Sequence, residues 1–130
     1  MIFFTSDSHF NHSNIIKYCN RPFSTVEEMN EKLIHNWNKI ISSKDEIYHL
    51  GDFIFCKTEE QFLSIFDRLN GKIHWILGKH DEKIHKKLSQ ETKDKFESIS
   101  QLKEINVSDV GGGSQKIILC HYSFRVFNGS

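Results

Sequence analysis

The stretch KIHWILGKHDEK, residues 72–83, decides the fold that we expect for this chain. Its largely apolar run, Ile73 to Leu77, has the pattern of a buried strand. The run stops at Gly78, and a lysine, a histidine and an aspartate follow at once. A strand that ends in this way predicts a reactive rim at its carboxyl end, because ligands of layered α/β folds bind there.

Three further segments have the same arrangement of an apolar run followed by a compact polar cluster. They are residues 2–5 before Asp7 and His9, residues 46–50 before Gly51 and Asp52, and residues 115–120 before His121. The carboxyl ends of neighbouring strands lie along one rim of such a sheet. We therefore expect the four clusters to form one shared site.

Amphipathic segments between these runs predict two helices. In residues 24–42, apolar residues recur every four positions, and Ser24 with Glu27 predicts a capping box at the start of the helix. Thr58 with Gln61 predicts the cap of the second helix. Both segments separate predicted strands, as they do in an α/β chain.

The other segments complete the expected organisation. We expect a short helix over residues 15–18, a helix plus an irregular stretch over residues 82–101, and two strands around the Gly-Gly-Gly turn at residues 111–113. The alternation of strands and helices predicts the α/β class and a single layered domain over residues 1–130.

The composition narrows the classes of function. Lys plus Arg and Asp plus Glu number 17 each, so the formal net charge is zero. This balance argues against a general nucleic-acid binder, and nucleic acid is expected only as a substrate. The three cysteines lie at unrelated spacings, which favours reduced thiols and a cytoplasmic location. No signal-peptide pattern and no run of about 18 apolar residues is present, so no membrane partner is expected.

The side chains of the four clusters favour a metal site. Carboxylates and imidazoles without thiolates are typical ligands of Mn, Fe, Zn or Ni rather than of a structural zinc site. Asp7 and His9 lie two positions apart, and an extended backbone would turn both to one face. Asp52 could bridge two cations, an arrangement used for in-line displacement at phosphorus. We therefore expect one or two divalent metal ions per chain.

Taken in order, these motifs resemble the calcineurin-like metallophosphoesterase family, especially its small phage and bacterial members. The matching motifs are D-S-H at residues 7–9, G-D at 51–52, G-K-H-D at 78–81 and the histidine at 121. The family pattern is D-x-H, G-D, G-N-H-[DE], H and G-H-x-H. The stretches SDSHFNHSNIIKYCNRPF and IYHLGDF are the most similar, and the resemblance covers nearly the whole chain.

The resemblance implies a layered α-β-β-α sandwich and a metal-dependent phosphoesterase. Such an enzyme would hydrolyse phosphomonoesters or nucleotide-type phosphodiesters by metal-activated water. Transferred by position, Asp7 and His9 would bind the first metal, His121 the second, and Asp52 both. His80 would act on the phosphoryl group as an acid or charge stabiliser. Asp81 would orient His80.

Lys79 stands where the family has an asparagine ligand of the second metal. The lysine could turn away, replace the second cation, or lose its proton and coordinate. We favour replacement, since a lysine can neutralise a phosphate as a point charge. Lys79 is therefore predicted to bind substrate, together with His12, which follows the first cluster closely.

The chain reaches Ser130 without the family's closing G-H-x-H motif. We therefore expect a sandwich truncated at its C-terminus, with an exposed edge that a homo-oligomer would cover. Two alternatives stay open beside the active enzyme. One is a degenerate, weak or inactive family member that binds a phosphate-bearing ligand or a protein. The other is a fragment of a longer enzyme.

Three of the remaining histidines are expected to carry no chemistry. His35, His74 and His85 fall at positions that predict exposure to solvent. His49 precedes the Gly-Asp turn by two residues, and the sequence leaves open whether it supports the site from behind or only fills the core.

Overall fold

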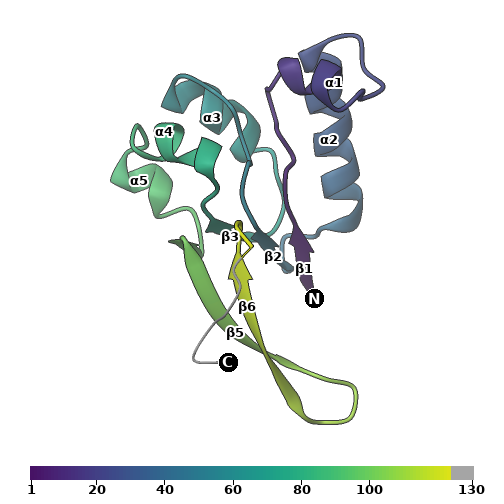
Figure 1. Ribbon diagram of the computed structural model, residues 1–130, viewed down its shortest axis with the longest axis vertical. Coiled ribbons are helices and arrows are strands. Elements are labelled where there is room, and N and C mark those ends of the chain that lie inside the picture. Colours follow the sequence, from purple (N-terminus) through teal and green to yellow (C-terminus); the bar gives the residue numbers. More distant parts are fainter. Residues whose placement is uncertain (124–130) are drawn as a thin grey trace.

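The computed structural model describes residues 1–123, which stack a layer of helices, a parallel sheet and an antiparallel hairpin (Figure 1). The strands are β1 (Ile2–Thr5), β2 (Glu46–His49), β3 (Lys72–Ile76), β4 (Ser98–Ser100), β5 (Leu102–Ser108) and β6 (Ser114–Cys120). The helices are α1 (Asn14–Tyr18), α2 (Val26–Ile40), α3 (Glu59–Phe66), the 3-10 turn η1 (Lys79–Asp81), α4 (Glu82–His85) and α5 (Gln90–Lys93). The predicted α/β class is confirmed.

The central sheet has four parallel strands in the order β1-β2-β3-β4. The expected irregular stretch within residues 82–101 is wrong in part, because it contains β4. That strand has the sequence Ser-Ile-Ser, too short to show a period. It is a strand because it pairs with β3, a contact from distant residues that the local sequence does not encode.

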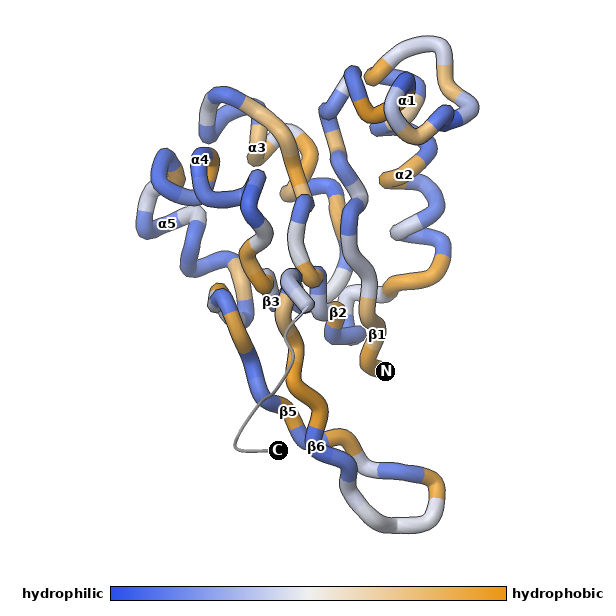
Figure 2. The backbone as a smooth tube through the Cα atoms, in the orientation of Figure 1, coloured by the Kyte–Doolittle hydropathy of each residue, from blue (hydrophilic) through white to orange (hydrophobic). Residues whose placement is uncertain are grey.

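The hairpin of β5 and β6 forms a separate antiparallel sheet. The expectation that residues 115–120 contribute a neighbouring strand of one rim is therefore wrong. These residues pack across the face of the parallel sheet, where Ile105 and Leu119 form a small core with Tyr48 and Ile76. Figure 2 shows β6 as a largely apolar strand where it approaches β3. The hairpin packs there because this face of the sheet offers apolar partners.

The larger core lies between the helices and the opposite face of the sheet, and aromatic rings dominate it. Trp75 on β3 packs against Phe62 on α3, with ring centroids 5.7 Å apart. Phe53 lies edge-on to both, at 6.0 Å from Trp75 and 6.4 Å from Phe62. All three side chains are fully buried. No helix within residues 1–123 combines the length and apolar character that a membrane crossing requires.

Side-chain caps fix where the two long helices begin. The Thr58 hydroxyl accepts a hydrogen bond from the backbone N–H of Gln61, which confirms the predicted cap of α3. The predicted Ser24–Glu27 box of α2 is wrong by one position, because Thr25 caps the N–H of Glu28. Both pairs satisfy the spacing of a capping box, so the sequence could not separate them.

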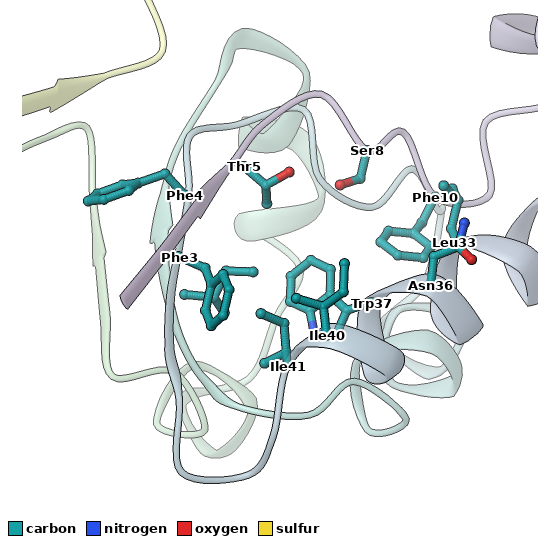
Figure 3. Close-up of a pocket in the computed structure, with 11 residues that line it drawn as sticks. Phe3, Phe4, Thr5, Ser8, Phe10, Leu33, Asn36, Trp37, Ile40 and Ile41 are labelled. Atoms are coloured by element: carbon teal, nitrogen blue, oxygen red, sulfur yellow. The ribbon is translucent and has the colours of Figure 1, made fainter. Parts of the chain in front are cut away.

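β1 lies at one edge of the sheet and packs on α2. Figure 3 shows Phe3 on the same side of β1 as Trp37 and Ile41, with Phe4 pointing away. An apolar groove of about 290 Å³ lies between β1 and α2. Within residues 1–123, β2 is the one strand beside β1, so the outer edge of β1 has no strand partner.

His74 is buried, and its predicted exposure is wrong. Its ring nitrogens lie 3.0 Å from the Glu46 carboxylate and 2.7 Å from the Ser98 hydroxyl, on the two neighbouring strands. Its ring also stacks on Tyr48 at 4.1 Å. The prediction failed because β3 is an inner strand that is covered on both faces. A polar residue on such a strand need not face solvent.

Replacing Phe62 with alanine should lower the free energy of unfolding by about 3–5 kcal/mol, because the cavity would open inside the aromatic core. Urea unfolding followed by circular dichroism measures this. The exposed neighbour Glu60→Ala is the matched control and should change the value by less than about 0.5 kcal/mol. Equal effects of the two substitutions would contradict the described packing of α3.

Candidate functional site

Two loop segments that follow β1 and β2 run side by side and form the rim of the site. The backbone N–H of Asp7 donates to the carbonyl of Gly51 at 2.9 Å, and that of His9 donates to the carbonyl of Asp52 at 3.0 Å. Phe10 continues the pairing with Phe53 at 2.9 Å. The parallel pairing of the strands thus continues into the loops and brings the D-S-H and G-D motifs together.

The backbone of this rim is unusual, because three of its polar residues have left-handed φ angles. The values are 54° at Asp7, 53° at His9 and 54° at Asp52. The expectation that an extended backbone turns Asp7 and His9 to one face is therefore wrong. Left-handed conformations of non-glycine residues cost about 1–3 kcal/mol each and are concentrated at functional sites. Here the hydrogen bonds between the two loops hold them in place.

The four predicted metal-ligating residues converge. The Asp52 Oδ2 atom lies 3.6 Å from His9 Nε2 and 3.7 Å from His121 Nε2. The Asp7 Oδ1 atom lies 3.8 Å from His9 Nε2. Ligand atoms of Asp7, Asp52 and His121 all lie within 4.8 Å of one another. We call these four residues, Asp7, His9, Asp52 and His121, the carboxylate–imidazole cluster.

His121 reaches the cluster from the end of β6, on the second sheet. Its Nδ1 atom lies 2.6 Å from the carbonyl oxygen of Leu50. A carbonyl oxygen only accepts, so Nδ1 carries the proton and donates it. Its Nε2 atom faces Asp52, and donation of the Nδ1 proton to a backbone carbonyl is how metal-binding histidines are usually oriented.

His9 has a partner that sequence reasoning did not identify. Its Nδ1 atom lies 3.0 Å from Nδ1 of His12, so one ring donates and the other accepts. Burial lowers the pKa of His9 and also the pKa of His12, which favours neutral rings. If His9 donates through Nδ1, its Nε2 atom faces the carboxylates with a free lone pair. His12, which was predicted from its position to bind substrate, contacts the His9 ring and stacks on Phe55.

One oxygen of the cluster is buried without a partner. Asp52 Oδ1 is inaccessible to solvent and accepts no hydrogen bond from the described residues. A buried carboxylate oxygen is costly unless a cation or donor compensates it. Two glycines leave room for the side chains of the cluster, Gly78 for the Asp52 carboxylate and Gly51 for the His121 ring. A Cβ at Gly78 would lie 2.8 Å from Asp52 Oδ1, and one at Gly51, where φ is 106°, would collide with the His121 ring.

Asp81 joins the loops that follow β2 and β3 through hydrogen bonds to their backbone. Its fully buried carboxylate accepts hydrogen bonds from the backbone N–H groups of Asp52 at 2.8 Å, Phe53 at 2.9 Å and Gly78 at 2.7 Å. Burial raises the pKa of Asp81, and the three N–H donors oppose that shift. The prediction that Asp81 orients His80 is therefore wrong. The carboxylate is directed at the backbone of the loops that follow β2 and β3 instead.

His80 and Lys79 lie on the same rim but outside the cluster. Both side chains are exposed, and both line a cleft of about 380 Å³ together with Phe55. The Phe55 ring lies 5.4 Å from His80 and 4.8 Å from His9, so the cleft adjoins the cluster. The structure thus places His80 near the cluster, as expected, and directs Lys79 into the cleft.

His49 supports the rim from the core. The backbone N–H of Gly51 donates to its Nδ1 atom at 3.2 Å, so Nε2 carries the proton and donates to the Ser8 hydroxyl at 2.8 Å. Complete burial lowers the pKa of His49 to about 3. The open question about this residue is thereby answered, since it packs in the core and also bonds both rim loops.

Arg21 is a further residue of the site, and its role was not identified from the sequence. Its guanidinium donates to the carbonyl of Ser8 at 2.8 Å and to that of Asp7 at 3.0 Å. These hydrogen bonds stabilise the loop in which Asp7 and His9 have left-handed φ angles. The only indication of this role in the sequence is a single arginine close to a polar motif, which is weak.

Comparison with known proteins places the chain among relatives whose descriptions state no activity. No family model matches it. It is 54% identical over 82 residues to the uncharacterized protein MJ1445 of Methanocaldococcus jannaschii, a match that covers 62% of this chain and 47% of that protein. It is 30% identical over 132 residues to the Gene 66 protein of Mycobacterium phage L5, covering 93% of this chain and 62% of that protein.

A solved structure shares the fold. The chain superposes on AQ665 of Aquifex aeolicus, a protein of unknown function, with a TM-score of 0.66 and 28% identity. The match covers 94% of this chain and 60% of that one. This chain spans about half to three-fifths of the length of the relatives that it matches.

Replacing Asp81 with asparagine should lower the free energy of unfolding by about 2–4 kcal/mol, because the amide cannot accept three hydrogen bonds and would direct N–H donors at N–H donors. Urea unfolding measures the loss. The adjacent, exposed Glu82→Gln removes the same charge and should change stability by less than about 0.5 kcal/mol. An Asp81→Asn chain as stable as the control would contradict the role assigned to this carboxylate.

Stability should depend on pH through His49. Its pKa is about 3 in the folded chain against 6.5 for a free ring, so the unfolded chain binds the proton first as the pH falls. The stability that the neutral ring allows is complete above pH 6.5 and is lost as the pH falls towards 3. His49 alone should cost about 2 kcal/mol between pH 7 and pH 5.

The measurement is urea unfolding at pH 7 and pH 5 for the wild-type chain and for His49→Gln, which cannot bind a proton. The loss between the two pH values should be smaller in the variant by about 2 kcal/mol. The other histidines are common to both chains and cancel. If the two chains lose the same stability between pH 7 and pH 5, His49 binds a proton equally well in the folded and the unfolded chain, which would contradict its low pKa.

Proposed function

We propose that this chain is a metal-dependent phosphoesterase of the calcineurin-like metallophosphoesterase type, acting on phosphomonoesters or nucleotide-type phosphodiesters. The observation that carries the proposal is the convergence of Asp7, His9, Asp52 and His121 in one cluster. These residues come from three distant parts of the chain, in the order of the family motifs.

The cluster fits a divalent metal. Its donors are two carboxylates and two imidazoles, a set that suits Mn, Fe, Zn or Ni. The buried, partnerless Asp52 Oδ1 supports a cation beside it. The four cluster residues would hold one ion or two, with Asp52 shared between them. When bound, a divalent ion supplies a Lewis acid and activates water for attack at phosphorus.

The chain's own groups prepare this site. The Leu50 carbonyl accepts the Nδ1 proton of His121, and the His12 ring is hydrogen-bonded to Nδ1 of His9. The Nε2 atoms of both rings lie on the side of Asp52. Asp81 and Arg21 fix the loop backbones that carry Asp52 and Asp7. Ligand atoms fixed before binding lose little freedom when a ligand arrives, which favours tight binding.

His80 and Lys79 act on the substrate in this proposal. His80 is exposed on the rim beside Phe55, where its ring can donate a proton or a hydrogen bond to a phosphoryl oxygen or a leaving group. The Lys79 ammonium neutralises phosphate charge from the adjoining cleft.

The architecture and the cysteines support the remaining parts of the proposal. A helix layer and two strand layers within residues 1–123 are compatible with the α-β-β-α sandwich. The three cysteines are free thiols, which favours a reducing, cytoplasmic location.

Asp52→Asn should abolish both Mn²⁺ binding and hydrolysis of bis(p-nitrophenyl) phosphate, because Asp52 faces both imidazoles of the cluster. His80→Ala should keep Mn²⁺ binding and lose about 10²- to 10⁴-fold in turnover, the usual contribution of a general acid. Calorimetric Mn²⁺ titration and a colorimetric assay measure the two effects. Asp67→Asn, an exposed aspartate paired with Lys95, is the charge-matched control.

The outcomes separate the alternatives. Mn²⁺ binding without turnover in the wild-type chain would contradict the phosphoesterase and favour a family member that binds phosphate ligands. If His80→Ala removes the metal and leaves turnover per bound metal intact, His80 is a ligand and its proposed role is wrong. Asp52→Asn that binds Mn²⁺ as well as Asp67→Asn would contradict the metal site itself.

A further inference from the structure

The cleft beside the cluster, here named the lysine cleft, is lined by Phe55, Cys56, Lys79, His80 and Lys83 with two isoleucines. Its volume of about 380 Å³ lies within the range of small-molecule sites. Lys79 and His80 come from η1, and Lys83 comes from the following helix α4. One short segment therefore presents three basic side chains to the same hollow.

The lining carries positive charge without a counter-charge. It includes two lysines and a histidine, and no carboxylate is among the residues that line it. Burial raises the pKa of the Cys56 thiol to about 11, so the thiol is neutral at physiological pH and does not repel an anion. Lys87 adds a further cation nearby, since its ammonium donates to the Lys57 carbonyl at 3.1 Å. Although the formal net charge of the whole chain is zero, lysine side chains are concentrated at this cleft.

Phe55 joins the lysine cleft to the carboxylate–imidazole cluster. Its ring stacks on His12 with centroids 4.2 Å apart and planes 4° from parallel, and it lies 4.8 Å from His9. The same ring lines the cleft and lies 5.4 Å from His80. A ligand that extends from the cluster past Phe55 therefore reaches the two lysines.

We propose that the lysine cleft is a subsite for a second phosphate group of the substrate, held by Lys79 and Lys83 while the scissile phosphate lies at the cluster. The inference rests on the proposed function for the position of the scissile group. Phosphate is the anion best matched, because its multiple charge can use two lysine point charges at once. The preferred substrates are then organic phosphates with two or more phosphate groups, and single-phosphate esters leave the cleft unused.

The test compares two non-hydrolysed anions, methylenediphosphonate and inorganic phosphate, by calorimetric titration of the full chain as isolated, with its metal content left in place. The wild-type chain should bind the diphosphonate more tightly than phosphate. Lys83→Gln should weaken diphosphonate binding about tenfold, the loss of one charge-assisted hydrogen bond. Lys86→Gln, an exposed lysine outside the cleft, should change it less than twofold.

Two results would overturn the subsite. One is equal weakening by Lys83→Gln and Lys86→Gln, which would show a general charge effect. The other is diphosphonate binding no tighter than phosphate binding. Because binding is read without turnover, the two proposals fail separately. Lys83-dependent binding in a chain that hydrolyses nothing contradicts the phosphoesterase alone, and hydrolysis with Lys83-independent binding contradicts the subsite alone.

Discussion

The rim of this protein depends on one buried carboxylate. Asp81 accepts backbone N–H groups from Asp52, Phe53 and Gly78, so a single side chain connects the loops that follow β2 and β3. Charge-assisted hydrogen bonds of this kind are about twice as strong as neutral ones. This bond set fixes the backbone of Asp52, whose carboxylate lies between the two imidazoles of the cluster.

A second level of organisation acts on the imidazoles. His121 is held by the Leu50 carbonyl and His9 by the His12 ring, each through Nδ1. The remaining nitrogen of each ring points to the same oxygen of Asp52, at 3.6 Å and 3.7 Å. Backbone strain at Asp7, His9 and Asp52 accompanies this arrangement. The local cost is offset by loop pairing, the Arg21 bonds and burial of the aromatic core.

The sequence predicted which residues form the site better than it predicted how the fold brings them together. Apolar runs followed by Asp and His located Asp7, His9 and Asp52, because strand ends of a parallel sheet meet at one rim. The same pattern located His121, although its strand belongs to the antiparallel hairpin. It could not reveal that His121 arrives from a second sheet, or that Asp81 binds backbone instead of His80. Those facts depend on contacts between distant residues. The same limit applies to β4, whose three residues carry no pattern, and to His74, which is polar yet buried between strands.

The bond from His121 to Leu50 spans 71 positions of the chain. A contact of this separation carries a cost in chain entropy, which the packing of the hairpin on the sheet must offset. The cluster therefore assembles only in molecules whose hairpin has already docked on the sheet. Any ion or ligand that requires His121 would bind only chains in which the hairpin is docked on the sheet. Its occupancy would therefore measure the fraction of completely folded chains.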